Sequence, residues 1–206
     1  MGIAERKERD KQEMRDLIVQ EAAHIFAVEG YENTSIRSIA KRIEYSPATI
    51  YLYFKDKNEL FYAIHELTFG ILLNDMSQVL EIENPLERLR KIGHIYIDFS
   101  LKYPEYYNLM FNLMKPMQEL EAEKPWEWES GRQAFAFLEG VIQECLEKGL
   151  IKGRDAQSIT FYNWAFVHGL CTLHNNCRIR VMGMTPEEDQ QLLHQAVEDW
   201  VKAVEA

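Results

Sequence analysis

Apolar residues recur along most of this 206-residue chain at intervals of three and four positions, the spacing of one face of an α-helix. In the first such stripe, Ile18, Ala22, Ile25 and Phe26 share one face, and Gly30 follows at the expected helix end. The chain has no alternating apolar–polar stretch of useful length and no Asn-Gly or Asp-Gly hairpin signal. The pattern therefore predicts an all-α protein.

Caps and helix breakers set the expected helix boundaries. Ser46 precedes Pro47, and Thr185 precedes Pro186, so that each proline takes the first helical position. The pattern predicts about nine helices, over residues 11–29, 35–43, 46–54, 56–83, 85–102, 104–114, 126–148, 155–180 and 186–206. Residues 115–125 are expected to form a loop, or a loop with one helical turn. These divide into two unequal units, with a boundary inside the fourth helix near Ala63.

Residues 35–54 have the organisation of a helix-turn-helix. Two short helices, each with an apolar stripe, are joined by a tight turn over residues 44–46. The second helix directs Ile50 and Phe54 inward and exposes small and hydroxylated residues on its other faces: Ala48, Thr49, Tyr51 and Tyr53. A recognition helix with such a slim outer face can enter the major groove of DNA.

The net charge of −10, from 23 basic and 33 acidic residues, argues at first sight against nucleic acid as a partner. Its distribution reverses that impression. Residues 35–58 hold five bases and two acids, a balance of +3, whereas residues 61–206 hold 13 bases and 22 acids, a balance of −9. The expected DNA-binding segment is therefore mildly basic, whereas the rest of the chain that follows it is acidic.

The stretch TSIRSIAKRIEYSPATIYLYFKDKNELFYAI resembles the N-terminal domain of TetR-family transcriptional regulators, with a Tyr-x-x-Phe element and a lysine at the start of the fourth helix. The resemblance covers residues 12–72 and implies a three-helix DNA-binding domain. It implies that the following residues contact DNA: Thr34 or Ser35, Arg37, Ser46, Ala48, Thr49, Tyr51, Tyr53 and Lys57. Two positions depart from the family pattern. Glu44 replaces a glycine at a turn position that favours positive φ, and Tyr53 replaces a common histidine.

The same resemblance implies that residues 73–206 form a larger helical domain for ligand binding and dimerisation. Trp164-x-x-x-His168-Gly169 is similar to a signature of one group of these domains, and Ala165 and Gly169 leave room for another helix. The family pairs its last two helices in a four-helix bundle between subunits. The expected protein is therefore a homodimeric repressor that binds a pseudo-palindromic operator in double-stranded DNA and is released by a small effector.

Aromatic residues on the C-terminal helices are candidates for the wall of an apolar effector pocket, although helical cores need such residues in any case. Two histidines on otherwise apolar helices could supply polar contacts, or could be hydrogen-bonded core residues. The candidate ligand contacts are His94, Tyr107, Phe111, Phe135, Phe161, Trp164 and His168.

Two other functions remain open from the sequence. Cys171 and Cys177 with His168 and His174 suggest a redox or metal sensor, but steps of three residues spread these side chains around a helix. The other alternative is a helical ligand-binding protein or enzyme with a vestigial helix-turn-helix. Because no nucleophile–base pair, phosphate loop or paired-carboxylate motif stands out, we expect no enzyme, no cofactor and no metal site.

The chain has no run of 18 apolar residues and no apolar stretch of the kind that a secretory signal needs. We therefore expect a cytoplasmic protein with no membrane contact. The N-terminal segment from Glu5 to Arg15 holds five bases and four acids, which predicts a solvated arm. Insertion of Arg6 or Arg9 into a minor groove is a weaker alternative.

Overall fold

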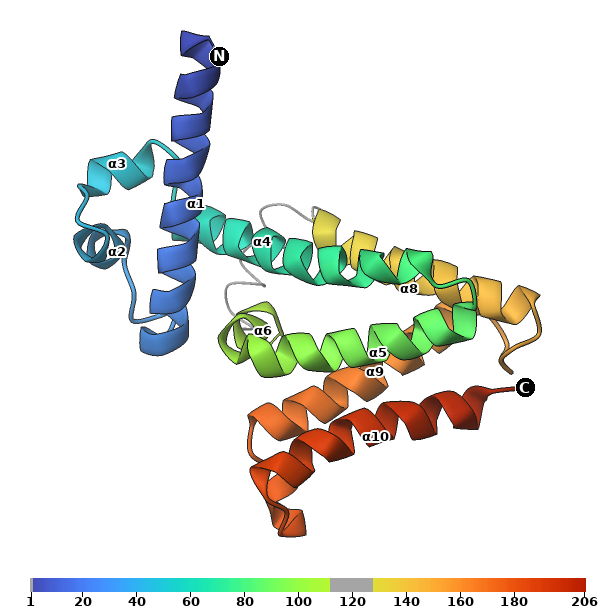
Figure 1. The fold of residues 1–206 in the computed structure, drawn as a ribbon. Helices are drawn as coiled ribbons and strands as arrows, with labels where there is room; N and C mark the ends of the chain where they lie inside the picture. The colour runs from blue at the N-terminus through green and yellow to red at the C-terminus, as the bar shows by residue number, and fades with distance from the viewer. Residues whose placement is uncertain (1, 112–127) are drawn as a thin grey trace. The chain divides into compact units, whose positions relative to one another are not determined.

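The computed structural model describes residues 2–111 and 128–206, and within them the backbone forms nine α-helices, two short 3-10 helices and no strand (Figure 1). The expected all-α fold is confirmed for this part of the chain. The helices are α1 (Ile3–Glu29), α2 (Ile36–Arg42), α3 (Pro47–Tyr51), α4 (Lys57–Ser77), α5 (Pro85–Lys102), α6 (Pro104–Phe111), α8 (Glu129–Glu147), α9 (Ala156–Asn175) and α10 (Pro186–Val204), with 3-10 helices η1 (Gln78–Glu81) and η2 (Ile179–Met182). The expected loop over 115–125, the sixth-helix end at Met114 and the helix start at Trp126 lie outside the described residues.

The described chain forms two compact units. Residues 2–68 and 105–111 belong to the first, and residues 69–104 and 128–206 belong to the second. The division falls inside α4, between Thr68 and Phe69. Helix α6 belongs to the first unit although α5, which precedes it in the chain, belongs to the second. Sequence patterns could not indicate this, because they show which helices exist but not which ones pack together.

The first unit is built around the apolar faces of α1 to α4. Ile18 of α1, Ile39 of α2, Ile50 of α3 and Leu60 of α4 are fully buried. An aromatic cluster closes one end of this core: the rings of Phe26, Tyr31 and Phe61 lie with centroids 5.2 to 6.4 Å apart. This packing holds the two short helices α2 and α3, which are too short to be stable alone.

Several helix ends differ from the prediction. Helix α1 begins at Ile3 instead of near Lys11, and α3 ends at Tyr51 instead of Phe54. Helices α4 and α9 are also shorter than expected, and each is followed by a 3-10 helix. Helix α9 ends where Cys177 takes a φ of 56° and the Arg178 N–H donates to the Leu173 carbonyl. This is a Schellman ending, and it needs a left-handed residue that a cysteine does not signal in a sequence.

The second unit places α5 among the other long helices, packed against α8, α9 and α10. Its interior contains Leu89 and Ile92 of α5, Ile142 of α8, Cys171 of α9 and Leu193 of α10, all nearly or fully buried. Thr185 caps α10, and Glu188 bonds back to the Thr185 N–H at 2.8 Å. None of the described helices is long and apolar enough to cross a bilayer.

The close approach of α5 and α10 requires Gly93. A Cβ at this position would lie 2.8 and 3.3 Å from the two methyl carbons of Val197. We expect Gly93→Ala to lower the free energy of unfolding by about 1 kcal/mol, because overpacking costs about 1–3 kcal/mol and better helix propensity offsets about 1 kcal/mol of it. Urea denaturation checks this value.

Gly140 of α8 provides the matched control, since a Cβ there meets no atom within 4 Å. Gly140→Ala should raise the free energy of unfolding by up to about 1 kcal/mol. In a Val197→Ala background the Gly93 substitution should also stop being destabilising. A Gly93→Ala protein as stable as Gly140→Ala would contradict the tight helix contact.

Candidate DNA-binding surface and ligand domain

Serine caps define both helices of the helix-turn-helix. The Ser35 hydroxyl accepts a hydrogen bond from the Ser38 N–H at 3.1 Å, at the start of α2. The Ser46 hydroxyl accepts one from the Thr49 N–H at 3.1 Å, at the start of α3, with Pro47 in the first helical position. The caps satisfy amide groups that a short helix would otherwise leave without partners, so they fix where each helix begins.

The turn between the two helices contains a left-handed residue. Glu44 has a φ of 60°, the Tyr45 N–H donates to the Ala40 carbonyl at 2.9 Å, and the Glu44 N–H donates to the Lys41 carbonyl. These bonds form the Schellman ending of α2. The expected preference for positive φ at Glu44 is therefore confirmed, and the turn keeps its geometry although glycine is absent.

We expect Glu44→Gly to raise the free energy of unfolding by about 0.5–1 kcal/mol. A left-handed conformation costs a residue with a Cβ about 1–2 kcal/mol, and the greater freedom of glycine in the unfolded chain offsets part of the gain. Urea denaturation measures the change. Glu44→Gln keeps the strain and removes the charge, so a Gln variant stabilised as much as the Gly variant would show that charge, and not φ, is responsible.

Five of the predicted DNA contacts are exposed on the surface of α2, α3 and their caps: Ser35, Arg37, Ser46, Ala48 and Tyr51. Thr49 and Tyr53 are half-buried. Thr34 is not on this surface, because it is only 3% exposed and its hydroxyl donates to the Gly30 carbonyl at 2.8 Å. Of the alternatives Thr34 and Ser35, the structure leaves Ser35 accessible to DNA.

Lys57 has a structural partner that the sequence did not predict. Its ammonium donates to the carbonyls of Tyr31 at 2.8 Å and Thr34 at 3.1 Å, and it lies 3.9 Å from the centre of the Tyr31 ring. Lys57 therefore ties the loop between α1 and α2 to the start of α4. A role in phosphate binding would add to this contact or compete with it.

Sequence reasoning missed two exposed residues on the same domain. Tyr45 in the turn is 42% exposed, and Leu52 after α3 is 79% exposed. A tyrosine in an otherwise polar turn is a signal that could have indicated the first. The bases Lys41, Arg42 and Lys55 of the same domain are exposed as well. Small, aromatic and basic side chains on one compact domain match the requirements of a DNA-reading surface.

In the second unit, three of the predicted ligand contacts lie in one cluster between α5, α8 and α9. The Trp164 indole donates to the Tyr96 hydroxyl at 3.3 Å, and that hydroxyl lies 3.2 Å from His168 Nδ1. The Phe135 ring meets Trp164 edge to face, with centroids 6.5 Å apart. Burial lowers the pKa of His168, so its neutral form is favoured. Tyr96 was missed, although its hydroxyl interrupts an apolar face of α5.

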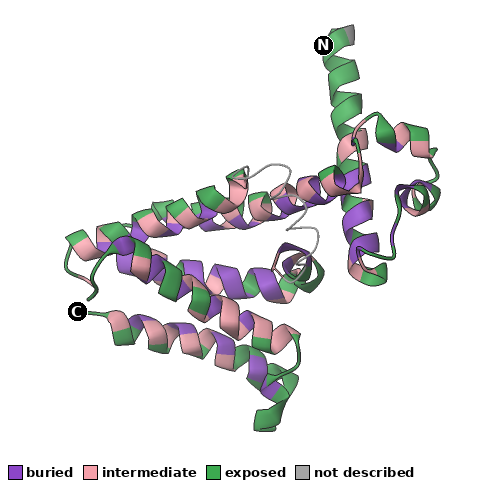
Figure 2. Ribbon diagram, turned by 180° about the vertical axis from the view of Figure 1, so that it is seen from behind, coloured by how far each residue is buried: buried purple, intermediate pink, exposed green. Residues whose placement is uncertain are grey.

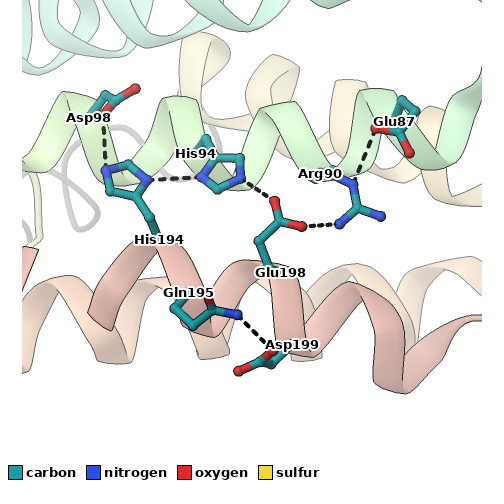
Figure 3. A network of polar contacts seen from close by, with 8 residues as sticks. All are labelled: Glu87, Arg90, His94, Asp98, His194, Gln195, Glu198 and Asp199. Atoms are coloured by element: carbon teal, nitrogen blue, oxygen red, sulfur yellow. Dashed lines mark hydrogen bonds and ion pairs between the residues drawn. The ribbon is translucent and has the colours of Figure 1, made fainter. Parts of the chain in front are cut away.

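His94 lies elsewhere, in a polar network that joins α5 to α10 (Figure 3). Its Nδ1 is 2.9 Å from Nδ1 of His194, and its Nε2 is 2.7 Å from Glu198. Asp98 and Arg90 extend the network at its two sides. The hydrogen bond with His94 holds the pKa of Glu198 below its usual value. Both ring nitrogens of His94 are therefore engaged in joining two helices, as expected for the alternative of a hydrogen-bonded histidine.

The remaining predicted ligand contacts are not in the cluster of Phe135, Trp164 and His168. Phe161 is 54% exposed on the outer side of α9. Tyr107 and Phe111 belong to the first unit, where their rings lie 5.0 Å apart. The first unit also contains His65, which the sequence did not single out. It is 5% exposed, and burial lowers its pKa to about 4 against the effect of a hydrogen bond to the Met110 backbone.

A groove of about 420 Å³ in the second unit contains none of the predicted ligand contacts. It lies along α5 and η1 and has both acidic and basic residues in its wall, including Asp75, Lys91, Asp98 and Lys102. A wall of mixed charge is unlike the apolar pocket that the sequence predicted.

The cysteines do not favour the redox or metal-sensing alternative. Cys145 and Cys171 are buried, and burial raises the pKa of each thiol to about 11, which disfavours the reactive thiolate. Cys177 is exposed. Within residues 2–111 and 128–206, no three His, Cys, Asp or Glu side chains are grouped so that they could hold a metal ion.

Comparisons with known proteins agree with this arrangement. Residues 18–64 match the family described as "Bacterial regulatory proteins, tetR family", and residues 89–200 match "Tetracyclin repressor-like, C-terminal domain". The chain is 27% identical over 169 residues to the HTH-type transcriptional repressor NicS of Pseudomonas putida, covering 80% of this chain and 76% of NicS.

Solved structures share the fold. The ketosteroid transcriptional regulator KstR2 of Mycobacterium tuberculosis superposes with a TM-score of 0.67 at 16% identity, covering 94% of this chain and 95% of that one. The fatty acid degradation regulator FadR of Bacillus halodurans gives a TM-score of 0.70 at 18% identity, covering 89% and 93%. The relatives are transcriptional regulators and not enzymes. With an N-terminal helix-turn-helix and a C-terminal helical domain that both match, the chain belongs to the TetR family of DNA-binding transcriptional regulators.

Proposed function

We propose that this regulator is a repressor that binds a pseudo-palindromic operator as a homodimer and is released by a small, largely apolar effector in the cytoplasm. The observation that carries the proposal is the exposed face of α3. Ala48 and Tyr51 are accessible there, on a serine-capped helix of a domain that also exposes basic side chains. NicS, the relative that the chain matches over most of its length, is named a repressor. The proposed base and phosphate contacts are Ser35, Arg37, Ser46, Ala48, Thr49, Tyr51 and Tyr53. Lys57 is proposed to bind phosphate in addition to its structural bonds to the Tyr31 and Thr34 carbonyls.

The exposed face of α9 supports the dimer. Phe161, Ala165, Gly169 and Leu173 follow one another at intervals of four residues, so they form one stripe along the helix. Phe161 is 54% exposed and Leu173 is 49% exposed, and a Cβ at Gly169 would meet open space. An apolar stripe with small residues at its centre suits the close crossing of a second copy of α9.

The cluster of Phe135, Tyr96, Trp164 and His168 supports an effector with an aromatic-walled site and few polar groups. KstR2 and FadR are named for ketosteroids and for fatty acid degradation, and both compound classes are largely apolar. Helix α4 contributes residues to both units, so a shift of α4 would couple ligand binding to the DNA-binding domain. The effector must prefer the non-binding state by about 1–3 kcal/mol to weaken DNA binding usefully.

Selection from random duplexes tests the DNA-binding part of the proposal. The full chain should enrich a palindromic site, and its affinity for that site should fall steeply as the salt concentration rises. A screen of apolar compounds then tests for release of the selected duplex. If selection at low salt enriches no palindrome, the proposed operator recognition is wrong; if no compound releases the duplex, the proposed effector class is wrong.

Sedimentation tests the dimer. Tyr162, which is 57% exposed beside the α9 stripe, can be replaced by glutamate to place a charge in the interface. We expect Tyr162→Glu to raise the dimer dissociation constant by at least tenfold, because an unpaired charge would be desolvated. Leu80→Glu, at a residue 59% exposed on η1, is the control and should sediment as the unsubstituted protein does. Equal dissociation constants for both variants would place the interface elsewhere.

A further inference from the structure

The first turns of α1 form a helix that contacts little of the remaining chain. Residues 4–13 are all exposed, and Figure 2 shows this end of α1 exposed over several turns. The segment is held by local contacts, since Arg6 pairs with Asp10, Arg9 pairs with Glu13, and the Gln12 amide bonds to Asp16 at 2.7 Å. It is therefore a solvent-exposed segment, as the charge pattern predicted, and it is also helical, because α1 begins at Ile3 instead of near Lys11.

The charges on this extension are segregated by face. Lys7, Lys11 and Arg15 are four residues apart, so they fall within about 80° of one another around the helix axis. Ile18 and Ala22, which are buried in the core of the first unit, lie on the same face. We call Lys7, Lys11 and Arg15 the basic stripe.

The opposite side of the extension is acidic. Only Glu8 lies at the edge of the basic stripe, which leaves three bases against one acid on that face, a balance of +2. The far side carries two bases and four acids, a balance of −2. The two bases, Arg6 and Arg9, form ion pairs. The four acids are Glu5, Asp10, Glu13 and Asp16. Of the bases on the described extension, Lys7 and Lys11 have no carboxylate within ion-pair distance.

One end of the basic stripe lies beside the segment that follows α3. The Arg15 guanidinium lies 5.1 Å from the centre of the Phe54 ring, and Phe54 comes three residues after the end of α3. The exposed Lys55 comes next in the chain. Figure 1 shows the first turns of α1 extending past α3 within the same unit. From Arg15 to Lys7 the stripe is about 12 Å long, the rise of eight helical residues and of three to four base pairs.

We propose that the basic stripe of α1 binds backbone phosphates of the DNA that flanks the segment read by α3. This inference rests on the proposed operator binding and adds a second contact region to it. The contact is electrostatic, so it adds affinity without reading bases. It also assigns the DNA contact to Lys7 and Lys11, and not to Arg6 or Arg9, whose charges are matched by acids on the far side.

The test compares two double variants on selected operator duplexes with long flanks. Lys7→Gln with Lys11→Gln removes two charges from the stripe, and Arg6→Gln with Arg9→Gln removes two charges from the far side. Glutamine keeps the helix propensity of both residue types, and circular dichroism checks the helix content. Affinity is measured by fluorescence anisotropy over a series of salt concentrations.

We expect the slope of log K against log salt to become shallower by about 1.8 in the Lys7/Lys11 variant, at about 0.9 for each lost phosphate contact, and to stay unchanged in the Arg6/Arg9 variant. The ratio of operator to scrambled-site affinity should stay the same in both. On a duplex trimmed to the operator, the unsubstituted protein and the Lys7/Lys11 variant should bind equally. If the unsubstituted protein binds specifically and all slopes agree, the stripe proposal is wrong; if the unsubstituted protein binds no duplex specifically, the proposed function itself fails.

Discussion

Replacing Tyr51 by alanine should lower operator affinity by about 1–3 kcal/mol, or about 5- to 150-fold, with little change in the stability of the fold. Tyr51 is the last residue of α3 and is 55% exposed, so its ring contributes little to the core and is available to DNA. Anisotropy titration on the selected duplex measures the loss of affinity. Urea denaturation should show that the free energy of unfolding changes by less than about 0.5 kcal/mol.

Two further variants identify what Tyr51 contributes. Tyr51→Phe keeps the ring and removes the hydroxyl, so it separates a hydrogen bond to DNA from a packing contact. Leu80→Ala, at an exposed residue of η1 in the other unit, should bind the operator as the unsubstituted protein does. Normal affinity in Tyr51→Ala would remove α3 from the proposed interface. Lys57→Ala is less informative, because it also removes the bonds to Tyr31 and Thr34.

Acid should destabilise the first unit through His65. Its pKa is about 4 in the folded chain, because burial disfavours the imidazolium, against an ordinary value of 6.5. Below pH 6.5 the unfolded chain therefore binds a proton that the folded chain excludes, and stability falls as the pH decreases from 6.5 towards 4. The contribution of His65 to this loss is about 2 kcal/mol at pH 5 and about 3 kcal/mol when complete.

Urea denaturation at pH 7 and pH 5 measures this effect as a difference between proteins. The glutamine side chain in His65→Gln is uncharged at both pH 7 and pH 5. Between these two pH values the free energy of unfolding of the variant should therefore fall by about 2 kcal/mol less than that of the unsubstituted protein. His24→Gln, at a side chain 53% exposed, should follow the unsubstituted protein. An equal loss in His65→Gln would show that His65 is protonated in the folded state at pH 5.

The DNA-binding surface was more predictable than the ligand domain, because its helix caps and turn depend on residues that are close together in the sequence. Ser35, Ser46 and Pro47 fix the starts of α2 and α3 through contacts within four residues, and such contacts can be recognised in a sequence. The turn at Glu44 follows the same rule, since its position predicts positive φ even without glycine. Thr34 and Lys57 were less predictable because their partners come from the loop between α1 and α2.

The candidate ligand contacts lie in different parts of the structure, because the position of each side chain depends on partners that are distant in the sequence. His94 and His168 lie on apolar helices and look equivalent in sequence. His94 meets His194 and Glu198, about one hundred residues away in the chain, whereas His168 meets Tyr96. No local pattern specifies which helix packs against which, so the two histidines could not be distinguished before their packing partners were known.

By itself, the sequence determined the helical class, the helix-turn-helix, its caps and its basic balance, because periodicity, capping and charge depend on residues close together in the chain. The tertiary structure decided that α6 joins the first unit, that Thr34 turns inward and that Phe161 turns outward. It also decided that Arg15, at one end of the basic stripe of α1, contacts Phe54 just beyond α3. These outcomes depend on which apolar faces meet, and only the packed chain specifies that.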